Sequence, residues 1–430
     1  MSEPILIGVL CLLGLLVFLL SGLWVAIGIG MVGALAFFIF TGGAAFTPYI
    51  PWTSTNSFPL AAIPLYILMG EFLLQSGISA RLYRATSMWL SPVPGGLLHS
   101  NIVSCALFAA VSGSSAATAA TIGTVAVPEL EKRNYDSKLT LGSLAAGGTL
   151  GILIPPSLPL IIYGVISASS VGKLFMGGVI PGIILSVSFM IYIGIRVLAN
   201  RGLAPVSEVF SLKAIIPSIV DVLPIIILAI IVLGGIFGGI VTPTEAAALG
   251  AAAALIMGLA FRRLTWQSFV ESLSSTLKVS CMVLFIVVGA SILGGFLGML
   301  GLPKALATFA TTSGLPREMI LAAVFLVYVF LGCFMEGMSL LILTVPTVLP
   351  AIQAIGMDPI WFGVVVVLLI EVCLLTPPVG VNLYIIQGIS KKSLGEVALG
   401  AAPFFLIILA ILGVLTAFPS VVLWLPSLMR

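Results

Sequence analysis

The sequence carries little charge and a single histidine. Only 7% of its 430 residues are charged, His99 is the one histidine, and 60% of the residues are hydrophobic. So little polar surface cannot cover a water-soluble globule of this length. One histidine without an acidic or cysteine cluster beside it cannot form a metal site. The composition therefore indicates an integral membrane protein.

Other missing features exclude further classes. The lysines and arginines are scattered singly or in pairs, which argues against nucleic-acid binding. No GxxxxGK[ST] motif is present, so the chain carries no ATPase site of its own and binds no nucleotide. The sequence contains no Ser/His/Asp set and no paired aspartates on adjacent spans, which argues against an enzyme. The five cysteines lack CxxC spacing and fit small buried hydrophobes; they are Cys11, Cys105, Cys281, Cys333 and Cys373.

Long apolar segments fill most of the chain, and no side chain between Pro4 and Gly70 is charged. Lipid admits only helices or closed barrels, and apolar runs without alternation exclude a barrel. We predict an all-α polytopic membrane protein with about ten spans plus two re-entrant helical hairpins. The predicted spans are 5–20, 23–40, 60–75, 139–167, 174–198, 215–240, 245–261, 279–300, 360–389 and 397–425, and the hairpins are 97–131 and 319–354. Residues 79–90 and 265–277 look amphipathic, which fits interfacial helices or connecting loops.

The second half of the chain repeats the first at an offset of 222 residues. Pro128 precedes the pair Pro155-Pro156 by 27 residues. Pro350 precedes the pair Pro377-Pro378 by the same interval. Duplicated membrane chains whose helices are broken by glycine and proline are typical of secondary transporters, whose site lies where the halves meet. The repeat therefore predicts a transporter.

The distribution of basic residues predicts the orientation. With the N-terminus outside, thirteen of the 17 lysines and arginines face the cytoplasm, in agreement with the positive-inside rule. Hairpin 97–131 then enters from the cytoplasm and hairpin 319–354 from the periplasm, so we predict an inverted-topology repeat. The four basic residues left outside are Lys173, Lys304, Arg317 and Arg430.

Hydroxyl groups gather in the middle of the first hairpin, where residues 112–118 read SGSSAAT. A tip at membrane depth frees backbone groups that protein, water or a ligand must satisfy. The segment therefore predicts a binding tip. Close helix packing through small residues is the alternative.

Each proline pair interrupts a spanning segment. Two prolines remove two backbone donors and end the helical ladder. Carbonyls left before the prolines suit a small hard cation such as sodium, and a half-helix starting after them can hold a carboxylate at its positive end. A simple kink is the alternative at either place, but two breaks at matching positions, each near a hairpin, argue against it.

Acidic residues inside apolar segments are costly and usually functional. Glu336 lies in the second hairpin's tip, at the repeat counterpart of Ser114. Glu371 lies one turn before Thr376 and contacts a ligand or fixes the hairpin against the broken helix. Glu245 follows Thr-Pro-Thr at a helix start, where a negative charge complements the helix dipole.

Four motifs carry a resemblance to a known family: SGSSAATAATIG, GILIPPSLPLIIYG, GGIVTPTEAAALG and LLTPPVGVNLYII. Together they resemble the large membrane subunit of tripartite ATP-independent periplasmic (TRAP) transporters over the whole chain. The resemblance implies an elevator-type importer of organic anions in the bacterial inner membrane, driven by a sodium gradient. It also implies a small four-helix membrane subunit and a soluble periplasmic binding protein as partners. No four-helix extension precedes Ile5, so we expect the small subunit to be a separate chain.

The resemblance also implies particular site residues. Family members often have glycine at the position of Cys373, which matters little if the contact is a backbone carbonyl. The sodium contacts would be Ser112, Ser114, Gly151, Ile154 and Pro155 in one half, and Gly332, Cys373, Thr376 and Val379 in the other. We expect substrate contacts from Ser114, Ser115, Ser157, Glu336, Gly337, Gly380 and Asn382.

The expected layout separates a scaffold from a moving transport domain. Residues 1–58 and 215–261 would form the scaffold, 60–181 and 279–403 the two repeats with their hairpins and broken helices, and 404–430 a C-terminal span. Sialic acids and C4-dicarboxylates are the leading substrate candidates because both carry a carboxylate. The alternatives are a stand-alone ion-coupled carboxylate transporter without a binding protein, an intramembrane enzyme and a channel.

The predicted orientation can be tested by labelling in intact cells. We expect a cysteine introduced at Thr53 to react with an impermeant thiol reagent from the periplasm, because the uncharged loop 41–58 faces outward. A cysteine at Arg133 should react only from the cytoplasm. The reverse labelling would contradict both the orientation and the inverted repeat.

Overall fold

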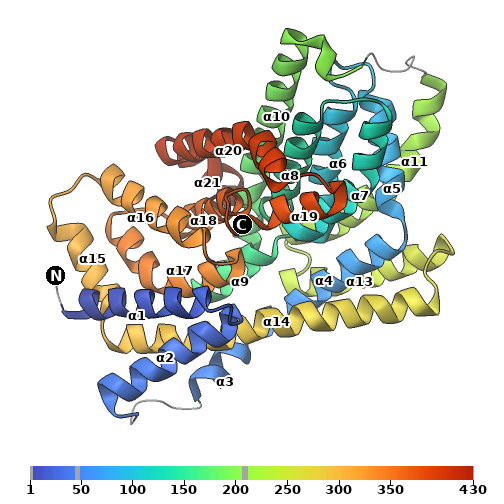
Figure 1. The fold of residues 1–430 in the computed structure, drawn as a ribbon. Coiled ribbons are helices and arrows are strands. Elements are labelled where there is room, and N and C mark those ends of the chain that lie inside the picture. The colour runs from blue at the N-terminus through green and yellow to red at the C-terminus, as the bar shows by residue number, and fades with distance from the viewer. Residues whose placement is uncertain (1–2, 44–48, 206–211, 430) are drawn as a thin grey trace.

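All the elements in the described residues are helices, as predicted (Figure 1). The computed structural model describes residues 3–43, 49–205 and 212–429. Nine segments in these ranges are long and apolar enough to cross a membrane. The all-helical membrane fold is therefore confirmed, while the number of crossings and the re-entrant course of the hairpins stay predictions.

The order of helices in one half of the chain recurs in the other. The first half runs α1 (Glu3–Leu20), α2 (Val25–Thr41), α3 (Tyr49–Thr55), η1 (Phe58–Ala61), α4 (Ala62–Gln75), α5 (Ile78–Leu90), α6 (Leu97–Ser112), α7 (Ser115–Lys132), α8 (Ser137–Leu153), α9 (Leu158–Ile166) and α10 (Val171–Ala199). After the short turn η2 (Arg201–Leu203) come α11 (Leu212–Ala229), the π-helical turn η3 (Ile230–Gly234), α12 (Gly235–Phe237) and α13 (Pro243–Ala260). The second half runs α14 (Trp266–Met299), α15 (Leu302–Thr312), α16 (Arg317–Gly332), α17 (Gly337–Ala354), α18 (Pro359–Leu374), α19 (Val381–Ser390), α20 (Leu394–Ala417) and α21 (Ser420–Ser427). The pairs α6–α7 and α16–α17 occupy the predicted hairpins, and α8–α9 and α18–α19 are the two interrupted helices.

Repeat-related residues start equivalent helices in the same way. Asp136 caps α8, where its carboxylate accepts a hydrogen bond from the Leu139 amide at 2.8 Å. Asp358 caps α18 by accepting one from the Ile360 amide at 2.6 Å. Capping carboxylates satisfy amides that have no partner inside the helix. Asp136 and Asp358 are separated by the repeat offset of 222 residues because each caps the start of an equivalent helix in its own half.

The structure corrects several predicted boundaries. Residues 265–277 do not form a separate interfacial helix or a loop: they continue into the span 279–300 as the single 34-residue helix α14, since neither glycine nor proline interrupts the sequence there. The predicted span 397–425 is divided between two helices: α20 ends at Ala417, before Pro419, and α21 follows. Helices α3 and α15 were not predicted.

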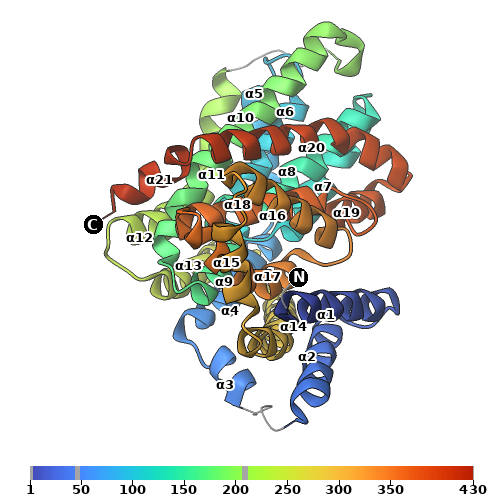
Figure 2. The ribbon, with the colours of Figure 1, turned by 90° about the vertical axis from the view of Figure 1, so that its left-hand side faces the viewer.

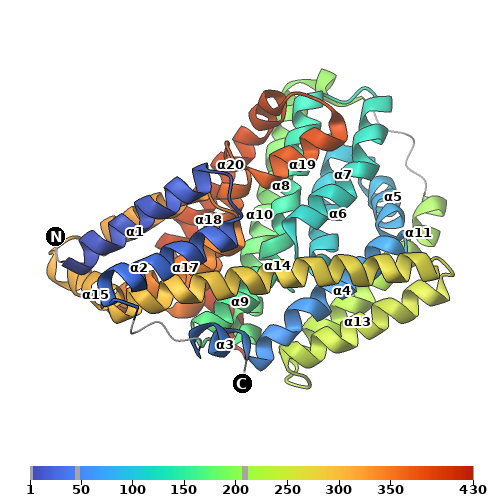
Figure 3. The same cartoon turned by 60° about the horizontal axis from the view of Figure 1, so that its bottom comes forward.

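The two halves interlock through their broken helices. Helix α19 packs against α7 and α8 of the first half, and α9 packs against α17 and α18 of the second. Beneath these elements α14 contacts α2, α3, α4 and α17, and Figure 3 shows it running the length of the molecule, with α1 and α2 toward one end and α4 and α13 toward the other. Helices α20 and α21 cross the opposite side (Figure 2). The centre is therefore enclosed by elements from both halves.

Helix α8 is among the most buried of the described helices, since every residue from Leu139 to Leu153 is buried. Helix α20 crosses it in direct backbone contact at Gly142 and Gly400. A Cβ atom on Gly142 would overlap the Gly400 carbonyl, and a Cβ atom on Gly400 would overlap the carbonyl of Lys138. The crossing is thus closed to any residue larger than glycine.

We expect Gly142→Ala to destabilise the protein by about 1–3 kcal/mol, the range for overpacking a close contact. The measurement is equilibrium unfolding in detergent micelles. Gly413→Ala on α20 is the matched control, because no atom lies within 4 Å of its would-be Cβ. Equal stability of the two variants would contradict the close crossing.

Candidate functional site

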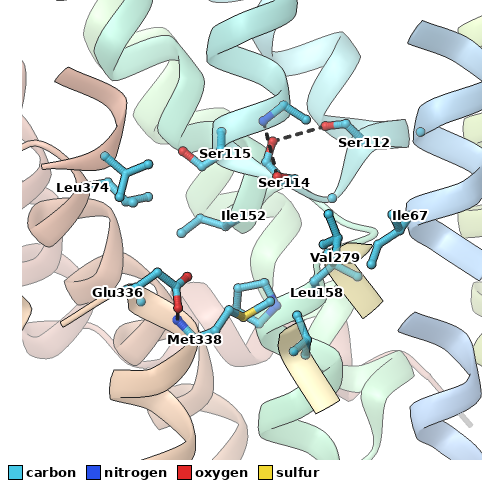
Figure 4. Close-up of a pocket in the computed structure, with 18 of the residues that line it drawn as sticks. Ile67, Ser112, Ser114, Ser115, Ile152, Leu158, Val279, Glu336, Met338 and Leu374 are labelled. Carbon is cyan, nitrogen blue, oxygen red and sulfur yellow. Dashed lines mark hydrogen bonds between the residues drawn. The ribbon is translucent and has the colours of Figure 1, made fainter. Parts of the chain in front are cut away.

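A cavity of about 370 Å³ lies where the two halves meet. Its walls come from α4 and α14 on one side, and from the tips of both hairpins and the broken helices on the other. Figure 4 shows Ser112 and Ser114 facing Glu336 and Met338 across the cavity, with Ile67 and Val279 at its side. A volume of this size is typical of sites for small organic molecules.

The first residues of four helices line this cavity: Ser115 of α7, Leu158 of α9, Gly337 of α17 and Val381 of α19. The first amides of a helix have no partner within the helix, and the helix dipole places partial positive charge there. Helix starts therefore attract anionic groups. Their convergence makes the cavity suitable for a carboxylate or sulfonate.

The first hairpin's tip is fixed to the first helix break. The Leu158 amide at the start of α9 donates a hydrogen bond to the Gly113 carbonyl at 3.4 Å. Gly113 has a φ of 62°, in the left-handed region that favours glycine, and a Cβ there would lie 2.8 Å from the Pro156 carbonyl oxygen. The hairpin and the break thus hold each other at membrane depth.

Neutral oxygen atoms cluster at this junction. The Ser114 carbonyl accepts a hydrogen bond from the Thr118 hydroxyl at 2.8 Å, and the Ser112 hydroxyl lies 2.8 Å from the same Thr118 oxygen. A Cβ on Gly151 would lie 2.5 Å from the Ser114 carbonyl oxygen and 2.7 Å from the Thr118 hydroxyl. Three predicted sodium contacts, Ser112, Ser114 and Gly151, are therefore brought together.

Thr118 was not predicted as a ligand. Its signal was present in the SGSSAAT segment, since it follows Ser114 by four residues and so returns to the same helix face. The other predicted contacts in this half lie in the break after α8. Ile154 packs its side chain on Gly182 of α10, and Pro155 is buried beside it in a cis bond to Pro156.

Three of the four predicted contacts in the second half, Gly332, Cys373 and Thr376, also meet, with different chemistry. Cys373 packs its sulfur directly on Gly332, and its thiol donates to the Tyr328 carbonyl at 3.6 Å. The Thr376 amide donates to the Cys373 carbonyl at 3.1 Å, and the Thr376 hydroxyl donates to the Val372 carbonyl at 2.6 Å. A donating hydroxyl keeps lone pairs with which to hold a cation. Val379 lies in the turn that follows the second cis proline bond, between Pro377 and Pro378.

Two carboxylates line the cavity. Glu336 caps α17, because its Oε2 accepts hydrogen bonds from the Met338 and Ser339 amides at 3.0 and 3.2 Å. Glu71 comes from α4, and its Oε1 accepts a hydrogen bond from the Ser275 hydroxyl at 2.5 Å. Sequence reasoning missed Glu71, although it is the first charge after the uncharged stretch that ends at Gly70.

The other two intramembrane glutamates lie elsewhere. Glu371 is fully buried, and neither of its carboxylate oxygens has a hydrogen-bond partner among the described residues. Its neighbours Ile370 and Leu374 line the cavity, whereas Glu371 does not. Glu245 accepts a hydrogen bond from the Thr242 amide at 2.8 Å and so has the helix-start role expected of it.

Three predicted substrate residues, Ser157, Gly380 and Asn382, are not among the residues that line the cavity. The Ser157 hydroxyl donates to the Ile152 carbonyl and caps α9. Gly380 precedes α19. The Asn382 amide nitrogen donates to the Ala145 carbonyl at 3.0 Å, while its oxygen accepts from the Ser115 hydroxyl at 2.9 Å. Of the predicted set, Ser114, Ser115, Glu336 and Gly337 line the cavity.

Comparison with known proteins gives a consistent assignment. The family described as "Tripartite ATP-independent periplasmic transporter, DctM component" matches residues 12–421. The isethionate TRAP transporter permease protein DctMQ of Oleidesulfovibrio alaskensis is 34% identical over 97% of this chain, which spans 65% of that relative's length. The C4-dicarboxylate TRAP transporter large permease protein DctM of Pseudomonas aeruginosa is 34% identical over 93% of each chain. The sialic acid TRAP transporter large permease protein SiaM of Vibrio cholerae is 32% identical over 92% of this chain and 93% of its own.

Solved structures share the fold at low sequence identity. The YdaH transporter of Alcanivorax borkumensis has a TM-score of 0.60 at 13% identity, covering 86% of both chains. MtrF of Neisseria gonorrhoeae has a TM-score of 0.59 at 12% identity, covering 90% of this chain and 85% of its own. At these identities the likeness concerns the fold alone.

The link between Ser115 and Asn382 can be tested by a double-mutant cycle. We expect Ser115→Ala and Asn382→Ala each to destabilise the protein, and the double variant to lose less than the sum by about 0.5–3 kcal/mol, since the residues share a buried hydrogen bond. Equilibrium unfolding in detergent micelles measures all four proteins. Strict additivity would mean that α7 and α19 are not joined there.

Proposed function

Because the chain belongs to the DctM component family of tripartite ATP-independent periplasmic transporters, and so is a multi-pass inner-membrane permease and not an enzyme, we propose that it imports an organic anion by sodium-coupled secondary active transport. The substrate class is an organic acid of the kind that sialic acid and the C4-dicarboxylates represent. The name of another relative includes isethionate, which is a sulfonate, so the proposed substrate class also includes sulfonates.

The cavity at the meeting of the halves carries this proposal. It has the size of a small organic molecule and is lined by four helix starts, which favour an anionic group. Secondary transporters built from repeats hold their substrates at such a junction of broken helices. An enzyme or a channel requires neither feature.

Sodium is the proposed coupling ion because the junction offers neutral oxygens. Ser112, Ser114 and Thr118 provide hydroxyl and carbonyl oxygens beside Gly151 in the first half. Thr376 provides a hydroxyl before the second break. Hydroxyl and carbonyl oxygens suit a hard monovalent cation.

An elevator mechanism fits the composition of the cavity walls. Helices α4 and α14 form one wall, and the hairpins with the broken helices form the other. Sliding of the second group past the first would carry a bound ligand across the membrane while the ligand keeps its contacts with the hairpins and broken helices. The small membrane subunit would brace the scaffold, and the periplasmic binding protein would deliver substrate to the open cavity.

A stand-alone carboxylate transporter is the second candidate, since this chain alone supplies the four helix starts that line the cavity and favour an anion. Uptake after deletion of a neighbouring binding-protein gene separates the two. Loss of uptake supports the tripartite system, and undiminished uptake supports the stand-alone one.

The sodium proposal predicts how uptake responds to sodium in proteoliposomes that also contain the small subunit and the loaded binding protein. We expect no uptake without a sodium gradient. Thr376→Val and Ser112→Ala should each raise the half-saturating sodium concentration roughly tenfold or more, since the loss of one hydroxyl ligand from a buried ion site costs about 1–3 kcal/mol.

Thr311→Val is the matched control, because Thr311 is exposed on α15 and its hydroxyl bonds within its own helix. It should leave sodium dependence unchanged. Uptake driven equally well by a proton gradient alone would disprove sodium coupling. An unaltered sodium dependence in Thr376→Val would exclude its hydroxyl as a ligand.

A further inference from the structure

The charges in the cavity are all of one sign. Glu71 and Glu336 are the ionisable side chains among the described residues that line it, and they come from different elements, α4 and the second hairpin's tip. Most of the remaining wall is apolar, including Ile67, Phe108 and Val283. A simple organic anion would therefore enter a cavity that already holds two carboxylates.

Glu336 is held rigidly with one oxygen engaged. Its Oε2 accepts both amides at the start of α17, which fixes the carboxylate at the wall where Figure 4 shows it. The positive end of the α17 dipole offsets only about half an elementary charge. The ionised form of Glu336 therefore presents negative charge to the cavity.

Glu71 is held on the wall that α4 and α14 form, in a comparable way. The Ser275 hydroxyl of α14 bonds to its Oε1, and the nearby cavity residues of α14 are Val279, Met282 and Val283. A neutral hydroxyl orients the carboxylate without cancelling its charge. Each of the two carboxylates therefore has a defined position on the wall and negative charge to offer a ligand.

Opposite charges interact strongly in a partly enclosed apolar cavity, because little water screens them. A ligand's ammonium group would gain a charge-assisted hydrogen bond from a glutamate. A second carboxylate on the ligand would be repelled, which discriminates against dicarboxylates. The ligand's own carboxylate still has the serine-rich start of α7, where Ser114, Ser115, Ala116 and Ala117 line the cavity.

We propose that Glu336 and Glu71 determine specificity for a zwitterion, a molecule that joins one carboxylate or sulfonate to an ammonium group on a compact, largely apolar body. The carboxylate or sulfonate lies at the start of α7, and the ammonium group lies toward the glutamates. This inference rests on the proposed function and narrows its substrate class.

The test measures direct binding to the purified chain in lipid nanodiscs with sodium present, by ligand-induced thermal stabilisation. The probes are matched pairs that differ by the amino group: L-leucine with 4-methylpentanoate, L-phenylalanine with 3-phenylpropanoate, and 4-aminobutanoate with butanoate. Succinate and isethionate are added as organic anions without an amino group. We expect the best ligand to be an amino member, bound at least about tenfold more tightly than its deaminated partner.

Glu336→Gln and Glu71→Gln should each reduce that preference about tenfold or more, while binding of the deaminated member is unchanged or improves. Glu271→Gln, an exposed carboxylate farther along α14 that bonds to Gln267, is the matched control and should keep the preference. If an acid without an amino group binds best, the zwitterion proposal is wrong. It is also wrong if the preference for the amino member survives in both cavity variants. Neither result contradicts the proposal of anion transport. Failure of every probe to bind would overturn the zwitterion proposal, while uptake in the proteoliposome assay tests anion import separately.

Discussion

Backbone groups that are freed inside a membrane must find partners in the protein, because lipid offers none. Two proline pairs free such groups at the centre of this chain, and the surrounding architecture satisfies them. At the first break the Leu158 amide bonds to the Gly113 carbonyl of the hairpin tip, and the Ser157 hydroxyl reaches back to the Ile152 carbonyl. The broken helix and the hairpin are therefore one unit, and the oxygens that remain between them form the candidate ion site.

The duplication preserves the backbone more closely than the side chains. Asp136 and Asp358 cap equivalent helices, yet the counterparts of Ser112, Ser114 and Thr118 in the second half are Phe334, Glu336 and Leu340. The first hairpin thus carries hydroxyls at its tip, and the second presents a carboxylate to the cavity. Under the proposed function, this divergence lets two similar backbone arrangements bind an ion and a substrate at one junction.

The sequence predicted the features that depend on local chemistry and repetition. The proline pairs placed both breaks, because proline acts on the backbone next to it, and polar residues inside apolar segments placed both hairpin tips. It did not predict Glu71 on the cavity wall or Asn382 between Ser115 and Ala145, because those roles depend on how distant helices pack. The continuous α14 was missed for another reason: a change from amphipathic to apolar sequence changes a helix's surroundings without ending it.

A structure of the chain bound to its transported substrate, solved by electron cryo-microscopy in the presence of sodium, tests the central claim most directly. The account predicts substrate density in the cavity between the two hairpin tips, in contact with the start of α7 and with Glu336. It also predicts ion density among Ser112, Ser114, Thr118 and Gly151. Substrate density at any other place, with this cavity empty, would contradict the assignment of the cavity as the transport site.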